Sequence, residues 1–191
     1  MSDDLVKRLF WNTPNWRREK FVNDWRSRTT KYDNAPFEDA DRIEELESEV
    51  LKKEVIHRAS ENIVERTINI VSVDQDNQGI LSTLTVDLTP GDGEVFVKSG
   101  PLIGFDFQNA QIDAVRAAAN FTNLTVDEDG DGIENLHTHF KVSSETNEKT
   151  VISRVDGPSA GAAASIATIA ALTDESIRND VVITGTISND G

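Results

Sequence analysis

The sequence contains no cysteine. Disulfide bonds, thiolate nucleophiles and cysteine-ligated metal sites are therefore excluded. It also lacks a long apolar run, because the longest one, Ala160–Leu172, is interrupted by Ser165 and Thr168 and is too short to span a bilayer. The N-terminal residues show neither the basic nor the apolar region of a secretory signal peptide. We therefore expect a cytoplasmic protein that does not act at a membrane.

Basic residues are few: 19 Lys and Arg stand against 34 Asp and Glu, which gives a formal net charge of −15. Because like charges repel, nucleic acids and anionic lipid surfaces are not expected as partners. Aspartate outnumbers glutamate, and lysine is scarce. Such acidity is compatible with simple solubility, but it is also typical of a halophilic protein, since high salt screens the self-repulsion. We prefer the second interpretation.

Glycine is absent before Gly79, whereas this first part of the chain holds all three tryptophans. The change in composition predicts a boundary near Thr67, between a helical arm of residues 1–66 and a globular domain of residues 67–191. Apolar residues at helical spacing predict a long helix over Glu38–Ile63. Its apolar stripe packs either on its own domain or on a helix of another subunit. Because tryptophan anchors interfaces well, the arm favours a homo-oligomer or a larger assembly.

Alternating apolar and polar residues begin at residue 67. This period of two is typical of strands. Turns rich in glycine and proline separate the predicted strands from one another. Strands are predicted at Thr67–Val73, Gly79–Leu88, Glu94–Lys98, His137–Val142 and Val181–Ile187, and helices at Asp3–Phe10, Trp16–Arg28, Gln108–Phe121 and Ser159–Leu172. The order of these elements predicts an α+β fold class, with an α-helical appendage at the N-terminus.

An acidic loop carries Asp127, Asp129 and Asp131 followed by Gly132, which matches the first half of an EF-hand. Position 12 of that motif is Thr138, where a bidentate glutamate is required. Two interpretations remain, a partial Ca²⁺ or Mg²⁺ loop and an acidic surface turn, of which we prefer the second. No metal or other cofactor is therefore expected.

His137 and His139 alternate on a predicted strand, so both side chains face the same side. We interpret them as polar residues of a half-exposed strand. A catalytic Ser–His pair with Ser159 is the alternative. A metal site built on the two histidines is disfavoured, because no third ligand has a suitable spacing.

Ser159 follows the dipeptide Gly157-Pro158 and precedes a helix of small residues. The start of a helix offers unpaired N–H groups and a positive dipole end, which suit a developing oxyanion. A serine hydroxyl is a weak nucleophile, so a nearby base is needed to activate it. Nucleophilic catalysis at Ser159 is the chemistry that this motif indicates.

Several motifs in the second part of the chain occur in the order found in one peptidase family. They are Leu84-Thr85-Val86-Asp87 with Pro90-Gly91-Asp92-Gly93-Glu94-Val95, Pro101–Ala110, Asp156-Gly157-Pro158-Ser159-Ala160-Gly161, and Thr184-Gly185-Thr186-Ile187 with Asp190-Gly191. Over residues 67–191 the chain resembles the Lon-type serine peptidases, and in particular archaeal Lon-like proteins.

The resemblance implies the Lon proteolytic fold and a Ser–Lys dyad. Ser159 would be the nucleophile, Thr184 would position the lysine, and Asp156 would contact that lysine. The oxyanion hole would lie in the surrounding loop, which consists of Gly157, Pro158, Ala160 and Gly161. No Walker-type GxxxxGK[ST] motif occurs, so the ATPase module of full Lon proteases is expected to be absent.

The lysine of the family lies further along the chain, after a Gly-Gly turn. No lysine follows Ser159 in this sequence, and the one basic residue there is Arg178. A guanidinium cannot be deprotonated in a protein, so Arg178 is excluded as the base. Lys141 and Lys149 precede the serine and do not match the family position.

Two functions remain open. The first is an ATP-independent Lon-like serine endopeptidase that cleaves exposed peptide segments, with its lysine located beyond Gly191 or on a second chain. The protein would then be a processed fragment or would act as an oligomer. The second is a catalytically inactive structural or interaction protein of a larger assembly, such as a virion or a capsid, built on the same fold.

Overall fold

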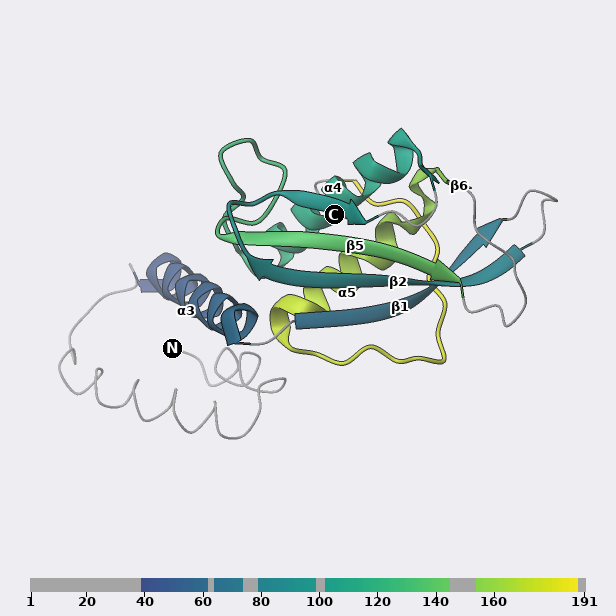
Figure 1. Ribbon diagram of the computed structural model, residues 1–191. Helices are drawn as coiled ribbons and strands as arrows, with labels where there is room; N and C mark the ends of the chain where they lie inside the picture. The colour runs from purple at the N-terminus through teal and green to yellow at the C-terminus, as the bar shows by residue number, and fades with distance from the viewer. Residues whose placement is uncertain (1–38, 62–63, 74–78, 99–101, 145–153, 189–191) are drawn as a thin grey trace. The chain divides into compact units, whose positions relative to one another are not determined.

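The computed structural model describes residues 39–61, 64–73, 79–98, 102–144 and 154–188 (Figure 1). The two helices predicted in the first 38 residues, and the three tryptophans there, lie outside the described part of the chain. One compact unit spans Glu44–Gly191. The boundary near Thr67 stays a prediction, and the first strand of the sheet begins at Val64. None of the helices in the described residues combines the length and the apolar character that a membrane crossing requires.

A four-stranded mixed sheet forms the centre of this unit (Figure 1). Its strands in spatial order are β1 (Val64–Val73), β2 (Gly79–Pro90), β5 (Leu136–Ser144) and β3 (Val95–Lys98). The pairs β1–β2 and β2–β5 are antiparallel, whereas β3 runs parallel to β5. A separate pair of short parallel strands, β4 (Leu102–Ile103) and β6 (Arg154–Val155), is not predicted by the sequence.

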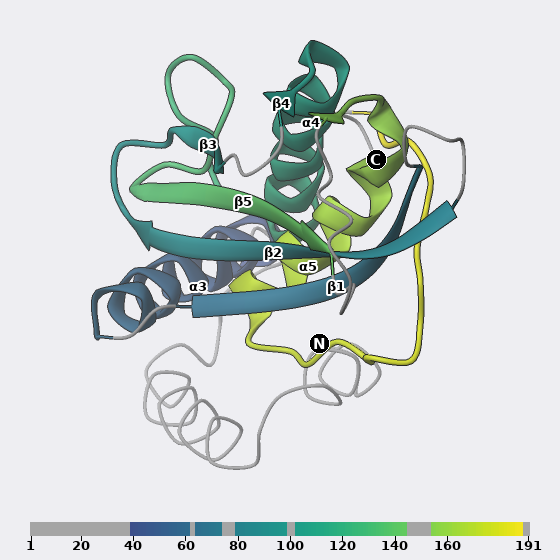
Figure 2. The same cartoon turned by 45° about the vertical axis from the view of Figure 1, so that its right-hand side comes forward.

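Alternation along the strands gives the sheet one buried face, which packs on two helices. Val86 and Phe140, paired across β2 and β5, are both fully buried there. The helices α4 (Phe105–Thr122) and α5 (Gly161–Thr173) lie side by side behind the sheet (Figure 2). Both helices carry buried alanines, which permit close packing of their backbones. The α+β prediction is confirmed.

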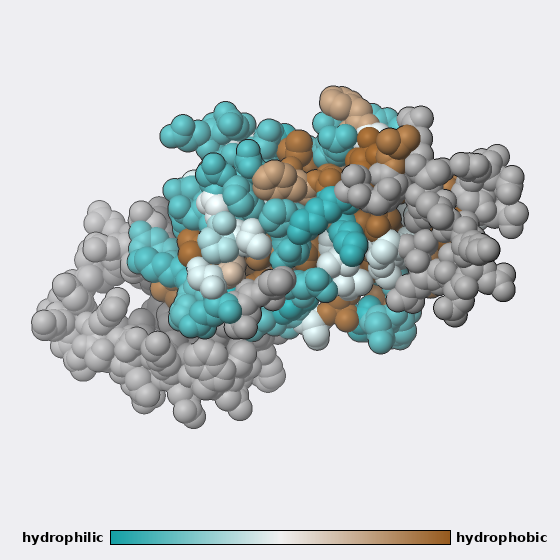
Figure 3. Space-filling view, in the orientation of Figure 1, coloured by the Kyte–Doolittle hydropathy of each residue, from teal (hydrophilic) through white to brown (hydrophobic). Residues whose placement is uncertain are grey.

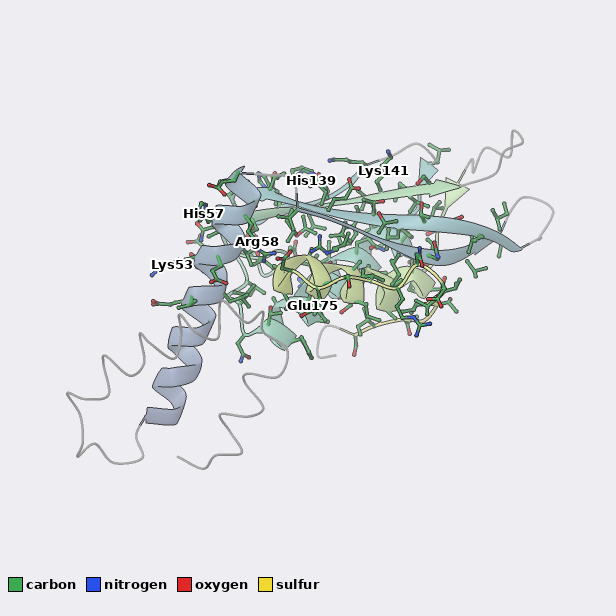
Figure 4. The ribbon with its side chains drawn as sticks, turned by 90° about the horizontal axis from the view of Figure 1, so that it is seen from below. Lys53, His57, Arg58, His139, Lys141 and Glu175 are labelled. Atoms are coloured by element: carbon green, nitrogen blue, oxygen red, sulfur yellow. The ribbon has the colours of Figure 1, made fainter. Side chains whose placement is uncertain are left out.

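The other face of the sheet, which we call the second face, carries the alternate side chains. On β2 and β5 these are Thr85, Asp87, His137, His139 and Lys141. Figure 4 shows His139 and Lys141 on the side of the sheet that points away from α5. The prediction that the two histidines share one side of a strand is confirmed.

The helix α3 (Asp39–Glu61) packs against the same core through its C-terminal half. Val55 is fully buried and Ala59 nearly so, and Leu51 and Ile56 are partly buried beside them. For this half of the helix, the apolar stripe therefore packs on its own domain rather than on another subunit.

Arg58 joins α3 to the end of α5 (Figure 4). Its Nη2 donates a hydrogen bond to the Leu172 carbonyl oxygen at 2.6 Å, and its Nη1 lies 3.1 Å from Asp174 Oδ1. Arg66 of β1 donates to the same carboxylate oxygen at 2.9 Å. The Arg58 side chain is only 22% exposed, so these charge-assisted bonds are partly shielded from solvent.

Replacing Arg58 with alanine is expected to lower the free energy of unfolding by about 2–3 kcal/mol, because it removes a charge-assisted bond and leaves the Leu172 carbonyl oxygen without its donor. Urea unfolding followed by circular dichroism measures this change. Lys53→Ala on the same helix is the matched control, since the Lys53 side chain is 78% exposed and pairs with the exposed Glu49. An exposed pair of this kind contributes about 0.5 kcal/mol or less. Equal losses in the two variants would contradict the role given to Arg58.

The predicted buried strand Val181–Ile187 is wrong. The segment is extended, but among the described residues it forms one parallel bridge, between Val182 and Asn69 of β1, and its residues alternate between partly buried and exposed. The Ile183 N–H donates to the Asn69 carbonyl of β1. The backbone hydrogen bonds of Gly185 join the segment instead to Ser159 and Ala162, at the start of α5. The apolar alternation therefore reflects one-sided packing at the edge of the sheet.

Candidate active site

Ser159 lies in a short 3₁₀ turn, η1 (Pro158–Ala160), which leads from β6 directly into α5. The helix predicted from Ser159 onward therefore begins with this turn and becomes α-helical at Gly161. Pro158 stands at the first helical position, where its fixed φ is favourable and its missing N–H costs nothing. Ala160 and Gly161 are buried and anchor the turn, whereas Ser159 is exposed.

Thr184 and its neighbour Gly185 lie against this turn, although they are far from it in the sequence. The Gly185 N–H donates to the Ser159 carbonyl oxygen at 2.7 Å, and the Thr184 hydroxyl approaches the same oxygen at 3.4 Å. The Ala162 N–H in turn donates to the Gly185 carbonyl at 3.0 Å. The extended segment thus fixes the start of α5, and Thr184 is exposed beside Ser159.

Asp156 comes just before the turn in the chain and is also exposed. Its Oδ1 accepts a hydrogen bond from the Gly157 N–H at 2.9 Å. The carboxyl group packs over Gly104, where an added Cβ would come within 2.0 Å of it. Because the Gly104 N–H donates to the Val155 carbonyl at 2.7 Å, the loop before Ser159 is tied to the start of α4.

An apolar surface adjoins this loop at the start of α4. Leu102 and Phe105 are 76% and 73% exposed, and β4 pairs with β6 immediately before the serine turn. Figure 3 shows apolar residues gathered in this region, next to hydrophilic residues that cover much of the remaining visible surface. Large exposed apolar side chains of this kind are typical of surfaces that bind a ligand or a partner.

The Ser159 hydroxyl forms no hydrogen bond with any other residue that the structure describes. It therefore stands at the start of a helix and is exposed, beside backbone N–H groups of the turn η1. A nucleophile with an adjacent oxyanion site requires this arrangement.

The sequence matches the Lon protease (S16) C-terminal proteolytic domain over residues 77–191, which is more than half of the chain. The chain belongs to the Lon protease family. No curated protein is similar enough to the chain to narrow its activity further. Because the Lon domain includes Ser159 and Thr184, the site described above belongs to a Lon-like serine peptidase domain at the level of the family.

No lysine contacts Ser159 in the described part of the Lon domain. Lys141 is exposed on the second face of the sheet, and Lys149 lies outside the described residues. Arg178 donates two hydrogen bonds to Asp180, at 2.9 and 2.6 Å. The bonds to this carboxylate raise the pKa of Arg178, which keeps its charge and cannot serve as a base.

His137 and His139 are not partners of Ser159, because they lie on the second face of the sheet while α5 packs on the first. His139 Nε2 is 3.0 Å from the Thr89 hydroxyl, and its ring stacks on Phe96 with centroids 4.9 Å apart. Burial lowers the pKa of His139, and the nearby Lys98 ammonium lowers it further. The alternative of a Ser–His pair is therefore wrong, because the sheet separates both imidazoles from Ser159.

Two carboxylates of the acidic loop, those of Asp127 and Asp131, hold the loop in place. Asp127 Oδ1 accepts the backbone N–H groups of Asp131 and Gly132 at 2.8 and 3.0 Å, and Asp131 forms an ion pair with Arg116. Asp129 is exposed. Among the described residues, these three do not come together as a group of metal ligands.

Proposed function

We propose that the protein is an ATP-independent serine endopeptidase in which Ser159 is the nucleophile. The observation that supports this most directly is the exposed, unengaged hydroxyl of Ser159 at the start of α5, with Thr184 and Gly185 bound to the same turn. The neutral amine of a lysine accepts the hydroxyl proton while Oγ bonds to the scissile carbonyl carbon. That amine comes either from residues after Gly191 or from a second chain.

The same protonated amine then supplies the proton to the leaving nitrogen as the C–N bond breaks. This releases one half of the substrate and leaves an ester on Ser159. Water, deprotonated by the lysine, hydrolyses that ester and restores the serine. During both steps the backbone N–H groups of the turn η1 stabilise the negative oxygen of the tetrahedral intermediate.

The lysine is active only in its neutral form, so its pKa must be lowered by burial. Ala160, Ile183 and Ile187 supply apolar surface on one side of the turn, since all three pack against or within the hydrophobic core. The hydroxyl of Thr184 forms a hydrogen bond with the incoming amine, a role supported by its contact with the Ser159 carbonyl oxygen.

The substrates are exposed peptide segments with apolar side chains. This specificity follows from Leu102 and Phe105, which present apolar surface next to the Asp156 loop. Hydrolysis of an unfolded protein such as casein, with and without ATP, tests the proposal. The assay is best run at high KCl concentration, because a net charge of −15 requires screening of its self-repulsion.

A fluorophosphonate that labels activated serines gives a second readout, followed by intact mass. Protein purified from its native cells is the preferred material, because its mass also shows whether residues follow Gly191. Labelling of Ser159 together with ATP-independent hydrolysis supports the peptidase. Neither labelling nor hydrolysis, in a protein shown to be folded, would favour a structural role for the Lon domain instead.

Thr184→Val is expected to lower kcat by about 10²-fold with little change in KM, because the hydroxyl positions the base and does not hold the substrate. Its contact with the Ser159 carbonyl is long, at 3.4 Å, so the free energy of unfolding should change by less than about 1 kcal/mol. Steady-state kinetics and urea unfolding separate the two effects. Thr186→Val, at the next exposed position of the segment, is the matched control. A similar kcat in both variants would contradict the positioning role.

A further inference from the structure

Three potential metal ligands meet where the turn after β2 passes the start of β5. They are Asp92, Glu94 and His137, and their ligand atoms all lie within 4.8 Å of one another. Asp92 and Glu94 are exposed, whereas the His137 side chain is only 23% exposed. The group lies on the second face of the sheet and is separate from the site at Ser159, so the inference drawn from it does not depend on the proposed peptidase.

Backbone contacts hold these residues in place. The Gly91 N–H donates to the Asn135 carbonyl at 3.2 Å, and the Thr138 N–H donates to the Glu94 carbonyl at 3.0 Å. The His137 ring packs on the backbone of Gly91 so closely that a Cβ there would come within 2.0 Å of the ring. The ligands are therefore positioned by rigid main chain on both sides, which lowers the entropy lost on binding an ion.

The His137 Nδ1 atom gives the strongest indication that an ion binds here. It is shielded from solvent, it has no hydrogen-bond partner among the residues that the structure describes, and Asp92 Oδ1 lies 3.5 Å away. Zn–N and Zn–O bonds of about 2.0–2.2 Å at a tetrahedral angle place two ligand atoms about 3.3–3.5 Å apart. The separation of Nδ1 and Oδ1 is thus the one that a shared zinc-like ion requires, and it is too long for a good hydrogen bond.

We propose that Asp92, Glu94 and His137 bind a divalent transition-metal cation of the zinc class. Two carboxylates and one imidazole form a mixed oxygen and nitrogen set, which suits Zn²⁺ and its neighbours better than Ca²⁺ or Mg²⁺, since those ions prefer oxygen ligands alone. Three protein ligands leave a coordination position for water. The ion joins the β2–β3 turn to β5, and so it stabilises this end of the sheet.

The surrounding charge favours a cation at this position. The acidic loop lies directly against the turn, since a Cβ at Gly93 would come within 2.6 Å of the Asp127 side chain. That loop also carries Asp129 and Asp131, of which Asp131 is paired with Arg116. The remaining negative charge raises the local concentration of cations and partly offsets the desolvation of the ion.

Isothermal titration of the untagged full chain with ZnSO₄ tests the proposal, and the visible absorption of bound Co²⁺ reports the coordination geometry. We expect one ion per chain and a tetrahedral Co²⁺ spectrum. Asp92→Asn and His137→Gln should each weaken binding by at least about tenfold. The matched controls are Asp129→Asn in the adjacent loop and His139→Gln on the same strand, and both should bind as the wild type does.

The Asp92 side chain is 84% exposed, so Asp92→Asn is expected to fold normally and carries the test even if His137→Gln does not fold. Absence of binding at about 1 mM Zn²⁺ would overturn the proposal, and Asp92 and His137 would then form a simple ion pair. Equal losses in the control variants would overturn it as well, because binding would then reflect the overall negative charge.

Discussion

Replacing Ser159 with alanine is expected to reduce peptide hydrolysis by at least about 10³-fold and to abolish fluorophosphonate labelling, because the variant has no oxygen to attack the scissile carbonyl. The helix start and the apolar surface at Leu102 and Phe105 remain, so substrate binding should change little. The loss should therefore appear in kcat and not in KM. Initial rates over a range of peptide concentrations, together with intact mass after labelling, measure both effects.

We expect this variant to fold as the wild type does, since Ser159 is exposed and its backbone carbonyl, not its hydroxyl, accepts the hydrogen bonds that hold the turn. We expect its urea midpoint to match the wild type within experimental error. Ser176→Ala is the matched control, because Ser176 is also exposed but lies after α5, away from the turn. Hydrolysis that persists in Ser159→Ala would show that another group acts as the nucleophile, and the proposed mechanism would fail.

Much of the Lon domain can be predicted from local patterns. The alternation of β1, β2 and β5 follows directly from burial on one face, and the helical spacing around Val115 and Ala118 gives α4. The segment Val181–Ile187 has the same alternation but is not a strand. A period of two shows only that one side of an extended segment is buried, and it does not show that a partner strand is present.

The residues at Ser159 are identified by motifs, while their arrangement depends on the fold. The sequence resemblance places Thr184 near the serine, and the structure adds the bonds by which Gly185 and Ala162 fix the turn. The contact between Asp156 and Gly104 has no signal in the sequence, because the pairing of β4 with β6 produces it. Two-residue strands carry too few residues for a periodic pattern.

The proximity of Asp92, Glu94 and His137 cannot be predicted from the sequence, for a related reason. No residue near the histidines in the chain has the spacing of a third ligand, whereas the pairing of β2 and β3 with β5 brings the distant turn Gly91-Asp92-Gly93 beside His137. Register between strands that are far apart in sequence is set by the whole core. The one available signal was the pair of acidic residues flanking Gly93, directly before a predicted strand.

The EF-hand motif includes Gly132, but the structure gives this glycine a different role. In the EF-hand interpretation it is the glycine of the sharp turn. In the structure its Cα instead lies against the backbone of Gly93, where an added Cβ would be 1.5 Å from the carbonyl oxygen. The acidic loop is therefore packed on the β2–β3 turn through this glycine, and no ion is needed to explain the residue.

Gly132→Ala is accordingly expected to lower the free energy of unfolding by about 3 kcal/mol, because the new methyl group overlaps a main-chain atom that no side-chain rotation can move. Gly130→Ala in the same loop separates this overlap from backbone strain. Gly130 has φ +74°, but nothing lies within 4 Å of its added Cβ. Alanine in the left-handed region costs about 1–2 kcal/mol, of which the reduced entropy of the unfolded chain returns a part.

Urea unfolding of the two variants at one fixed salt concentration makes the comparison, and the fixed salt matters because screening alters the stability of so acidic a chain. A larger loss in Gly132→Ala than in Gly130→Ala supports the close packing of the acidic loop on the β2–β3 turn. The reverse order would show that the loop moves away from Gly93 at little cost. In that case Asp92 and Glu94 would lose the rigid support on which the proposed metal site depends.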